Sequence, residues 1–496
     1  MPPSSSAGPS PLFVPLHPSP RLVAQMTGLS LQQCEMEVRQ QHKLKRMLRR
    51  IRASRQQTAL RTPRSSARLH AARSKAAMPS LQLPDAEAVE DTSDDRGEWS
   101  DDEDGMVRKM DVTMEIGDEP SDEELGRRVA RLINQIFGPQ PEVDGKQVAI
   151  HQLSGAMTNS VYMVTVTPAP AELPAKYLLR VYGAGVDEFL SREKELYWLR
   201  QLTALGFGPR LYGIFGNGRL EEYLESTTLR RDDIRKAATS KHIARRMSEL
   251  HALVSYYRPS RDKPQPELWA NIESWLRLAR RKWDRISAVC ARHEECTGIL
   301  ARWDDVERLA ARLQRAVEAA NSPVVFAHDD LQYGNILRLQ DTGELVVVDF
   351  EYAGYNYRGF DIANHFCEWM ADYHREADPH LLDEAAYPTD DERAVFLRTY
   401  IKSGAFLKAN IPADAGVVES DAHAYELRAV NLSEERIRAE VAAMEREVTP
   451  FVPASHLHWG LWGLLQSASS DIDFDYVAYA SQRLTLFLRQ ADALAE

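Results

Sequence analysis

The spacing of apolar positions divides the chain into stretches of different secondary structure. Between residues 121 and 138, apolar side chains recur every three or four positions, at Leu125, Val129, Leu132 and Ile136. This spacing predicts an amphipathic helix. Alternating or short apolar runs predict strands, which we place at 148–153, 161–167, 176–183, 209–215 and 219–225.

After Arg230 the apolar spacing is helical almost throughout. Besides one helix among the strands, at 191–205, amphipathic helices are expected at 243–254, 267–283, 303–320, 392–408, 432–447 and 455–468. A strand–loop–strand segment, 324–350, lies among them, whereas 409–432 is loop-like with weak helix signals. A small β-rich part followed by a large helical part predicts an α+β fold.

The first 120 residues have a different composition. A Pro/Ser-rich start is followed by a basic stretch, Arg39 to Lys75, and an acidic stretch, Asp85 to Glu124. Such segments bury too little apolar surface to offset chain entropy, so we expect 1–120 to be a mostly disordered tail. The basic stretch is most simply a solvated face. Binding to acidic lipid and folding back onto the acidic stretch are alternatives.

Two serines in or near this tail have competing interpretations. Ser100 precedes Asp101, Asp102 and Glu103, a context that favours phosphorylation. Ser121 is also followed by acids, but its spacing from Glu124 is that of a capping box, which we favour. An Arg- and Ser-rich start also suggests a mitochondrial transit peptide, but the early prolines break the helix that such a peptide needs.

Composition limits the remaining classes of protein. The chain has 496 residues, 44% of them hydrophobic, which is enough for a sizeable core. Its formal net charge of -12 argues against nucleic acid as the main partner. No apolar run reaches the length of a membrane span. The four cysteines are scattered without a CxxC pair, so we expect reduced thiols and a cytoplasmic protein.

The strongest chemical pattern lies at 324–352. The segment VVFAHDDLQYGNILRL is followed by ELVVVDFEY. An apolar strand leads to Asp330, Asn335 follows five residues later, and then come a strand, a turn and a second strand that ends at Asp349. Phosphoryl transfer needs a carboxylate that accepts the proton of the attacking hydroxyl, and an amide and a second carboxylate that hold Mg²⁺. Asp330 suits the first task, and Asn335 and Asp349 suit the second. Each acid alone could be a structural cap, but the combination favours catalysis.

The predicted strands carry candidate ATP contacts. Arg180 lies where kinases place a strand lysine on the phosphates, with Glu193 as its expected partner and Glu195 as the alternative; an arginine on a surface strand is the competing interpretation. The strand 220–224 resembles a hinge whose backbone binds adenine. The turn between the first two strands has backbone N–H groups and small hydroxyls that suit phosphates, although it is no G-x-G-x-x-G loop. Its residues are Gly155, Ala156, Met157, Thr158, Asn159 and Ser160.

These residues resemble the choline kinase family, and fungal members in particular. The resemblance runs in order from about Leu125 to the end and includes LLRVYG (178–183), GPRLYGIFGNGRLEEYL (208–224), DFEYAGYNYRGFDIANHFCEWMADY (349–373) and ASHLHWGLWGLLQ (454–466). It implies a protein-kinase-like two-lobed fold, with an ATP-binding N-lobe at 121–224 and a catalytic and choline-binding C-lobe at 225–496. It also implies ATP, Mg²⁺, phosphorylation of choline for phosphatidylcholine synthesis, and a homodimer.

Matching the family's motifs assigns roles to individual residues. Asp330 is implied to be the catalytic base, Asn335 and Asp349 the metal ligands, and Gln332 part of the catalytic loop. Arg180 is implied to contact phosphates, and Glu222 to Leu224 to form the adenine hinge. The implied choline-binding residues are Tyr352, Glu368, Tyr373, Trp459, Trp462 and Tyr479.

Physical chemistry supports the last group, because aromatic faces and a nearby carboxylate bind a quaternary ammonium ion. Trp459 and Trp462 are three apart and share a helix face, although ordinary core packing explains such a pair equally well. One residue departs from the family pattern, since Asp329 stands where the family usually has Asn. A second acid beside Asp330 could raise the pKa of Asp330 by repulsion.

Three other functions compete with choline phosphorylation. An ethanolamine kinase would have the same fold and chemistry, and the smaller cation fits the same aromatic site. A catalytically silent scaffold acting through its charged tail is disfavoured because the base and the metal ligands are all present. An antibiotic phosphotransferase would share the catalytic motif but would not need the aromatic residues.

Overall fold

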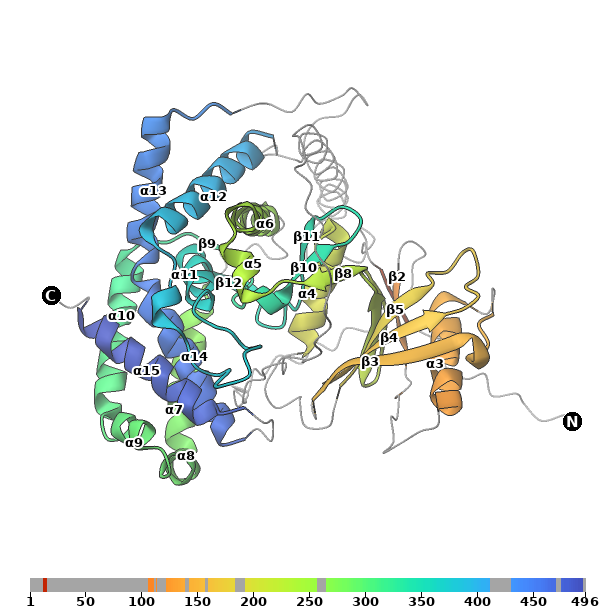
Figure 1. Ribbon diagram of the computed structural model, residues 1–496, viewed down its shortest axis with the longest axis horizontal. Helices are drawn as coiled ribbons and strands as arrows, with labels where there is room; N and C mark the ends of the chain where they lie inside the picture. Colours follow the sequence, from red (N-terminus) through yellow and green to blue (C-terminus); the bar gives the residue numbers. More distant parts are fainter. Residues whose placement is uncertain are drawn as a thin grey trace, which may run out of the picture. The chain divides into compact units, whose positions relative to one another are not determined.

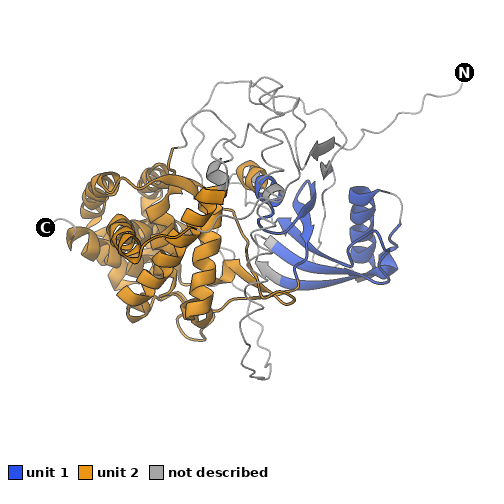
Figure 2. Ribbon diagram, turned by 90° about the horizontal axis from the view of Figure 1, so that it is seen from above, with its two compact units in different colours: residues 1–42, 89–185, 199–224 blue, residues 43–88, 186–198, 225–496 orange. Residues whose placement is uncertain are grey.

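A computed structural model gives the fold, and it describes residues 12–15, 106–110, 113, 122–138, 142–156, 159–182, 192–256, 265–410, 430–469 and 474–493. These residues fall into two compact units, coloured separately in Figure 2. The first comprises the described residues up to Tyr182 and 199–224. The second comprises 192–198 and the described residues from Glu225 onward. Ser100, Ser121, Thr158 and most of 409–432 lie outside the described residues.

The first unit is built on a seven-stranded sheet. In chain order its strands are β1 Leu12–Pro15, β2 Met106–Met110, β3 Val148–Ala156, β4 Asn159–Val166, β5 Lys176–Tyr182, β6 Leu211–Phe215 and β7 Gly218–Glu222. The spatial order is β1-β2-β6-β7-β5-β4-β3, and all neighbours are antiparallel except the parallel pair β2 and β6. The five strands expected from apolar patterning are therefore confirmed.

Two short strands, β1 and β2, fall within the segment expected to be mostly disordered. Both lie within 1–120, yet β2 pairs with β6 in the sheet. Met110 at the end of β2 is only 5% exposed and joins the core of the first unit. Strand β2 was not predicted because its short apolar stretch is surrounded by charged residues and is stabilised by pairing with β6.

Helix α3, Asp122–Phe137, packs against the sheet as its apolar stripe predicted (Figure 1). Val129 and Ile133 are fully buried in one cluster with Tyr177 and Leu179 of β5. Buried and partly exposed residues alternate along β5, as expected for a strand with one face on the core. This alternation places Arg180 on the opposite face of the sheet.

The second unit is mostly helical, and its helices confirm the helical pattern after Arg230. They are α4 Arg192–Leu205 (which continues into the first unit), α5 Arg231–Arg235, α6 Ala237–Tyr256, α7 Leu268–Arg281, α8 Trp283–Cys290, α9 Glu294–Leu300, α10 Trp303–Ala319, α11 Arg358–Glu368, α12 Asp390–Asn410, α13 Glu434–Val448, α14 Phe451–Ser467 and α15 Tyr476–Ala493. The single helix expected at 267–283 is broken at Lys282 into α7 and α8. No helix in the described stretches has the length and apolar character to cross a membrane.

Two small sheets carry the loops of the second unit. Strands β8 Ser226–Thr228, β10 Ile336–Leu339 and β11 Leu345–Val347 form one, in the order β11-β10-β8. Strands β9 Val324–Ala327 and β12 Gly354–Tyr357 form the other, which is antiparallel. The segment after β9 and the segment after β11 contain the residues of the predicted catalytic motif.

Helices α14 and α15 lie side by side (Figure 1). Two glycines allow this close approach. A Cβ at Gly463 would lie 2.7 Å from a ring carbon of Tyr479, and one at Gly460 would lie 2.8 Å from Leu484. The contact buries Trp462 completely and leaves Tyr479 1% exposed. The helix pair thus fixes two of the predicted choline-binding side chains.

The cysteines differ from expectation. Cys290 and Cys296 form a disulfide across the turn between α8 and α9, where their Cα atoms lie 5.4 Å apart. That separation is within the range for disulfides, but only the fold of the turn creates it. Cys367 carries a buried free thiol.

Candidate active site

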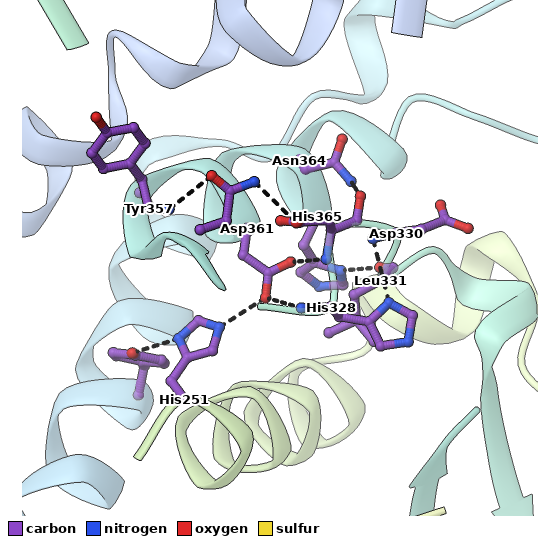
Figure 3. Close-up of polar contacts among 12 residues, drawn as sticks. His251, His328, Asp330, Leu331, Tyr357, Asp361, Asn364 and His365 are labelled. Carbon is purple, nitrogen blue, oxygen red and sulfur yellow. Dashed lines mark hydrogen bonds and ion pairs between the residues drawn. The ribbon is translucent and has the colours of Figure 1, made fainter. Parts of the chain in front are cut away.

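The segment that follows β9 is held by one buried carboxylate. The main-chain N–H groups of His328 and Asp329 donate to the two oxygens of Asp361 on α11, at 3.1 and 2.8 Å (Figure 3). Asp329 has a φ of 62°, a left-handed conformation that Asp tolerates better than most residues. Two consecutive amides therefore converge on Asp361, and Figure 3 shows the Asp330 carboxylate directed away from it.

Asp361 is itself stabilised as an anion. His251 Nε2 lies 2.8 Å from Asp361 Oδ2, and His251 Nδ1 lies 2.8 Å from the Tyr400 hydroxyl. Burial alone would raise the pKa of Asp361, but hydrogen bonds from the His251 side chain and the His328 main chain contribute to lowering that pKa. A carboxylate with several donors remains ionised even in the core. Asp361 can therefore hold the loop across the neutral pH range.

His328 connects the two halves of the catalytic motif. Its Nε2 donates to the main-chain oxygen of Val348 at 3.1 Å, and its Nδ1 accepts from the N–H of Asp330 at 3.3 Å. Complete burial lowers the pKa of His328, so the ring is neutral and one nitrogen donates while the other accepts. The imidazole thereby ties Asp330 to the residue before Asp349.

Asp330 and Asn335 are in direct contact. The Asn335 amide donates to both the main-chain oxygen and Oδ2 of Asp330, each at 2.9 Å. Burial and the carboxylates of Glu368 and Asp349 raise the pKa of Asp330 well above its ordinary value. A raised pKa makes a carboxylate a stronger base once it is ionised. The predicted base and one predicted metal ligand are thus held together.

The residues present fit Mg²⁺ in their chemistry. Asn335 uses its NH₂ group on Asp330, so its Oδ1 is the oxygen that remains for a cation. The N–H of Val348 donates to the main-chain oxygen of Asn335 at 3.0 Å, which brings Asp349 close to Asn335 in the fold. Mg²⁺ binds one or two protein oxygens together with phosphate oxygens. The described residues contain no group of three or more His, Cys, Asp or Glu side chains arranged to hold a metal ion.

Gln332 shapes the loop. Its main-chain N–H donates to the Asp330 oxygen at 2.9 Å, and its side chain accepts from the N–H of Gly334 at 3.1 Å. It therefore caps the 3₁₀ turn Tyr333–Asn335, which carries one predicted metal ligand. The structure gives Gln332 a supporting contact within the catalytic loop.

Asp329 occupies a position suited to a neutral side chain. One of its carboxyl oxygens accepts from Asn356 at 2.9 Å, and the other has no hydrogen-bond partner among the described residues. Burial and the charge of Asp361 raise its pKa well above the ordinary value. Asp329 is therefore protonated and neutral over a range in which an exposed Asp is ionised, and it resembles the Asn that the family usually has there.

The predicted aromatic residues form a continuous cluster. The ring centroids of Tyr352 and Trp459 lie 5.3 Å apart, those of Trp459 and Trp462 lie 5.5 Å apart, and those of Trp462 and Tyr479 lie 6.0 Å apart. Asn364 of α11 accepts from Trp459 Nε1 at 2.7 Å and donates to the Asp329 main-chain oxygen at 2.9 Å. The aromatic cluster is thus bonded through one side chain to the catalytic loop.

Glu368 and Tyr373 form the polar side of this cluster. The Tyr373 hydroxyl donates to Glu368 Oε2 at 2.8 Å, and Arg483 Nη2 donates to Glu368 Oε1 at 2.7 Å. The Arg483 guanidinium also lies over the Tyr479 ring, 5.2 Å from its centroid. Glu368 was expected to offer its charge to a cationic substrate. It is also paired with a buried arginine that the sequence pattern did not single out, and its contact with choline stays a prediction.

Comparison with known proteins agrees with this geometry. The profile of the "Choline/ethanolamine kinase" family matches residues 150–488, more than half of the chain. The chain is 35% identical to "Probable choline kinase 2" of Arabidopsis thaliana over 360 residues, covering 72% of this chain and 90% of that protein. It is 33% identical to "Choline kinase" of Schizosaccharomyces pombe over 349 residues, covering 67% and 74%.

The chain belongs to the choline/ethanolamine kinase family. The crystal structure of choline kinase from Cryptosporidium parvum has the same fold, with a TM-score of 0.56 and 24% identity, over 74% of this chain and 96% of that one. The expected architecture, a β-rich N-terminal part and a mostly helical remainder, is therefore confirmed. The family match includes every candidate site residue from Gly155 to Tyr479.

In this family member, the predicted phosphate contact Arg180 lies on β5 opposite Arg219 of β7. Arg219 is 3% exposed, pairs with Glu221 at 2.5 Å and donates to the Tyr182 hydroxyl at 2.9 Å. The alternation along β5 keeps the Arg180 side chain off the hydrophobic core. Its contact with phosphates stays a prediction.

The other predicted ATP contacts are only partly described. Gly155 and Asn159 lie in β3 and β4, where Gly155 pairs with Ser160 and Ala156 pairs with Asn159. In the predicted hinge, the N–H of Glu222 donates to the main-chain oxygen of Arg210 at 2.8 Å. These assignments remain predictions.

The predicted partners of Arg180 differ in exposure. On α4, Glu193 is exposed and Glu195 is buried. The pairing of either one with Arg180 stays a prediction, because α4 begins in the second unit and Arg180 belongs to the first.

Sequence reasoning missed three residues that organise the site. Asp361 and Asn364 lie three apart on α11, within the segment FDIANH that was noted only as part of the family pattern. A polar pair at helical spacing directly after a catalytic hairpin could have identified them. Arg483 gave no local signal, because its partner Glu368 lies 115 residues earlier.

Proposed function

We propose that this chain transfers the γ-phosphoryl group of ATP to the hydroxyl of choline, forming phosphocholine. The observation that carries the proposal is the joining of a kinase-type loop to an aromatic cluster through Asn364, which bonds to both Asp329 and Trp459. The loop supports phosphoryl transfer, and the aromatic cluster suits a methylated ammonium ion. Phosphocholine would serve phosphatidylcholine synthesis.

The catalytic loop supports a simple division of roles. Asp330 would accept the proton of the choline hydroxyl as the oxygen attacks the γ-phosphorus and the bond to the β-phosphate oxygen breaks, leaving ADP. Asn335 and Asp349 would hold Mg²⁺, which when bound would neutralise charge on the phosphates. Asn335 donates to the Asp330 carboxylate, and the Asp330 N–H donates to His328. These two hydrogen bonds keep the base in place before substrate arrives.

Choline recognition would rest on aromatic faces. A quaternary ammonium ion has no N–H to donate, so cation–π attraction from Trp and Tyr rings replaces hydrogen bonding. Rings of Tyr352, Trp459 and Trp462 follow one another at 5.3 and 5.5 Å. The carboxylate of Asp330 contributes negative potential near this cluster, since its charge acts on both Tyr352 and Tyr479.

Ethanolamine is the second candidate acceptor, because the family includes kinases for both amines. Its primary ammonium can donate hydrogen bonds and gains less from aromatic walls than choline does. We therefore expect both to be phosphorylated, with choline preferred several-fold.

The proposal is tested by measuring ADP release from Mg²⁺-ATP with choline, with ethanolamine and with no acceptor. Strong choline-dependent turnover supports it. Preference for ethanolamine would reassign the acceptor and leave the catalytic residues unchanged. Absence of acceptor-dependent turnover would favour the silent-scaffold function.

Four further expectations remain predictions. These are a cytoplasmic location, a homodimer, phosphorylation of Ser100 and use of Mg²⁺. The redox state of Cys290 and Cys296 tests the cytoplasmic location. Cytosolic reductants would keep these two thiols reduced, whereas the structure joins them in a disulfide. Counting free thiols in protein isolated under alkylating conditions would answer that question.

A further inference from the structure

Tyr333 lies in the catalytic loop between Gln332 and the metal ligand Asn335, and the proposed mechanism gives it no role. It is fully buried, at 0% exposed. Its hydroxyl oxygen accepts from the main-chain N–H of Tyr373 at 2.7 Å and lies 3.1 Å from Nδ1 of His374. The phenol therefore reaches out of the catalytic loop and holds the segment that carries a proposed choline-binding residue.

The hydrogens of this contact can be assigned. The Tyr333 oxygen accepts from Tyr373, so its own hydrogen is available for His374 Nδ1, which accepts it in the neutral ring. Burial lowers the pKa of His374, which favours that neutral form. The Tyr333 hydroxyl is thus used as both donor and acceptor, and a buried hydroxyl with both roles filled fixes its neighbours in place.

Ring contacts add to the hydrogen bonds. The Tyr333 ring centroid lies 6.0 Å from that of Tyr373, with an angle of 33° between the planes, and 5.5 Å from that of His374. These separations fall within the range of favourable aromatic contacts. Both the backbone and the ring of Tyr373 are therefore positioned by one side chain.

The position of Tyr373 matters for the polar side of the site. Its hydroxyl donates to Glu368 at 2.8 Å, and Glu368 is paired with Arg483. A continuous path thus runs from the turn that carries Asn335, through Tyr333 and Tyr373, to Glu368. A shift of the Tyr373 backbone would move its hydroxyl away from Glu368.

We propose that Tyr333 is a positioning residue for the amine substrate, acting through Tyr373. This role rests on the proposed function, because it assumes that the substrate is choline or ethanolamine. Its hydroxyl sets the apparent affinity for that amine, whereas the base, the metal ligands and the phosphate contacts do not depend on it. Loss of the hydroxyl is therefore expected to weaken amine binding and to leave the chemical step intact.

The test uses steady-state kinetics of the full chain and of Tyr333→Phe, with the preferred amine and ATP varied separately. We expect the KM for the amine to rise about three- to tenfold, the effect of losing one or two neutral hydrogen bonds. We expect kcat and the KM for ATP to stay within about twofold. Tyr357→Phe is the matched control, because its phenol points away from the Asp361 network (Figure 3).

A double-variant cycle gives the sharper test. If Tyr333 acts through Tyr373, then Tyr333→Phe should raise the KM for the amine much less when Tyr373→Phe is already present. An unchanged KM for the amine in Tyr333→Phe, a fall in kcat at unchanged KM, or additive effects in the double variant would overturn the proposal. Failure of the unaltered chain to phosphorylate any amine would instead refute the proposed function.

Discussion

Arg483 and Glu368 form a buried ion pair at the centre of the second unit, with 2.7 Å between Nη2 and Oε1. The two side chains are 0% and 3% exposed. Glu368 was expected to add negative potential for a cationic substrate, and Arg483 neutralises part of that charge. The charges of Glu368 and Asp330 both act on Tyr479, and Asp330 also acts on Tyr352.

We predict that Arg483→Met strongly destabilises the chain. It leaves Glu368 buried without its cation, and breaking one side of a buried pair typically costs about 3–5 kcal/mol. Replacing both residues, as Glu368→Gln with Arg483→Met, should restore much of the free energy of unfolding. Urea denaturation measures both effects. Equal losses of unfolding free energy in the single and double variants would show that these two charges do not stabilise each other.

We predict that Asp329→Asn stabilises the chain increasingly as pH rises. The folded pKa of Asp329 lies well above its ordinary value of 3.8, so between these two values the unfolded chain releases a proton that the folded chain retains. The natural chain therefore loses up to about 1.4 kcal/mol per pH unit in that range, whereas the variant does not. The free energy of unfolding, measured from pH 4 to 8, should diverge in favour of Asn. Parallel curves would show that Asp329 is ionised throughout.

We predict that Asp361→Asn lowers kcat by at least about tenfold. The amide cannot accept from His328, Asp329 and His251 as the carboxylate does, and its NH₂ group would face donors. The loop that carries Asp330 would then lose its anchor. Steady-state kinetics and thermal unfolding of the same samples separate a displaced loop from a lost fold. A folded variant with normal kcat would show that β9 alone positions the loop.

We predict that a chain shortened to 106–496 keeps its activity, whereas one shortened to 121–496 is less stable. All proposed catalytic residues follow Leu125, but β2 pairs with β6 and buries Met110. Losing that apolar side chain alone is expected to cost about 1.5–3 kcal/mol. Thermal unfolding of the two shortened chains makes the comparison. Identical stability would show that β2 contributes nothing to the sheet.

Apolar patterning predicted most helices and strands, because each was long and regular enough to show its period. The catalytic loop was also predictable, since Asp330, Asn335 and Asp349 lie within 20 residues and are spaced by a short turn and the β10–β11 hairpin. Strand β2 was missed because its pairing with β6 is decided by the sheet and not by its own composition.

Partnerships between distant segments could not be predicted. Asp361 meets His251 across 110 residues, and Glu368 meets Arg483 across 115. No local pattern specifies which buried charge faces which. The Cys290–Cys296 pair was missed although the two are close in sequence, because the turn between α8 and α9 determines their distance.

The most direct test of the account is phosphorus NMR of a mixture of the chain, Mg²⁺-ATP and choline, run beside the Asp330→Asn variant. The account predicts that the unaltered chain forms phosphocholine and ADP in equal amounts, and that the folded variant is slower by at least about a hundredfold. No phosphocholine from the unaltered chain, or a near-normal rate from Asp330→Asn, would contradict it.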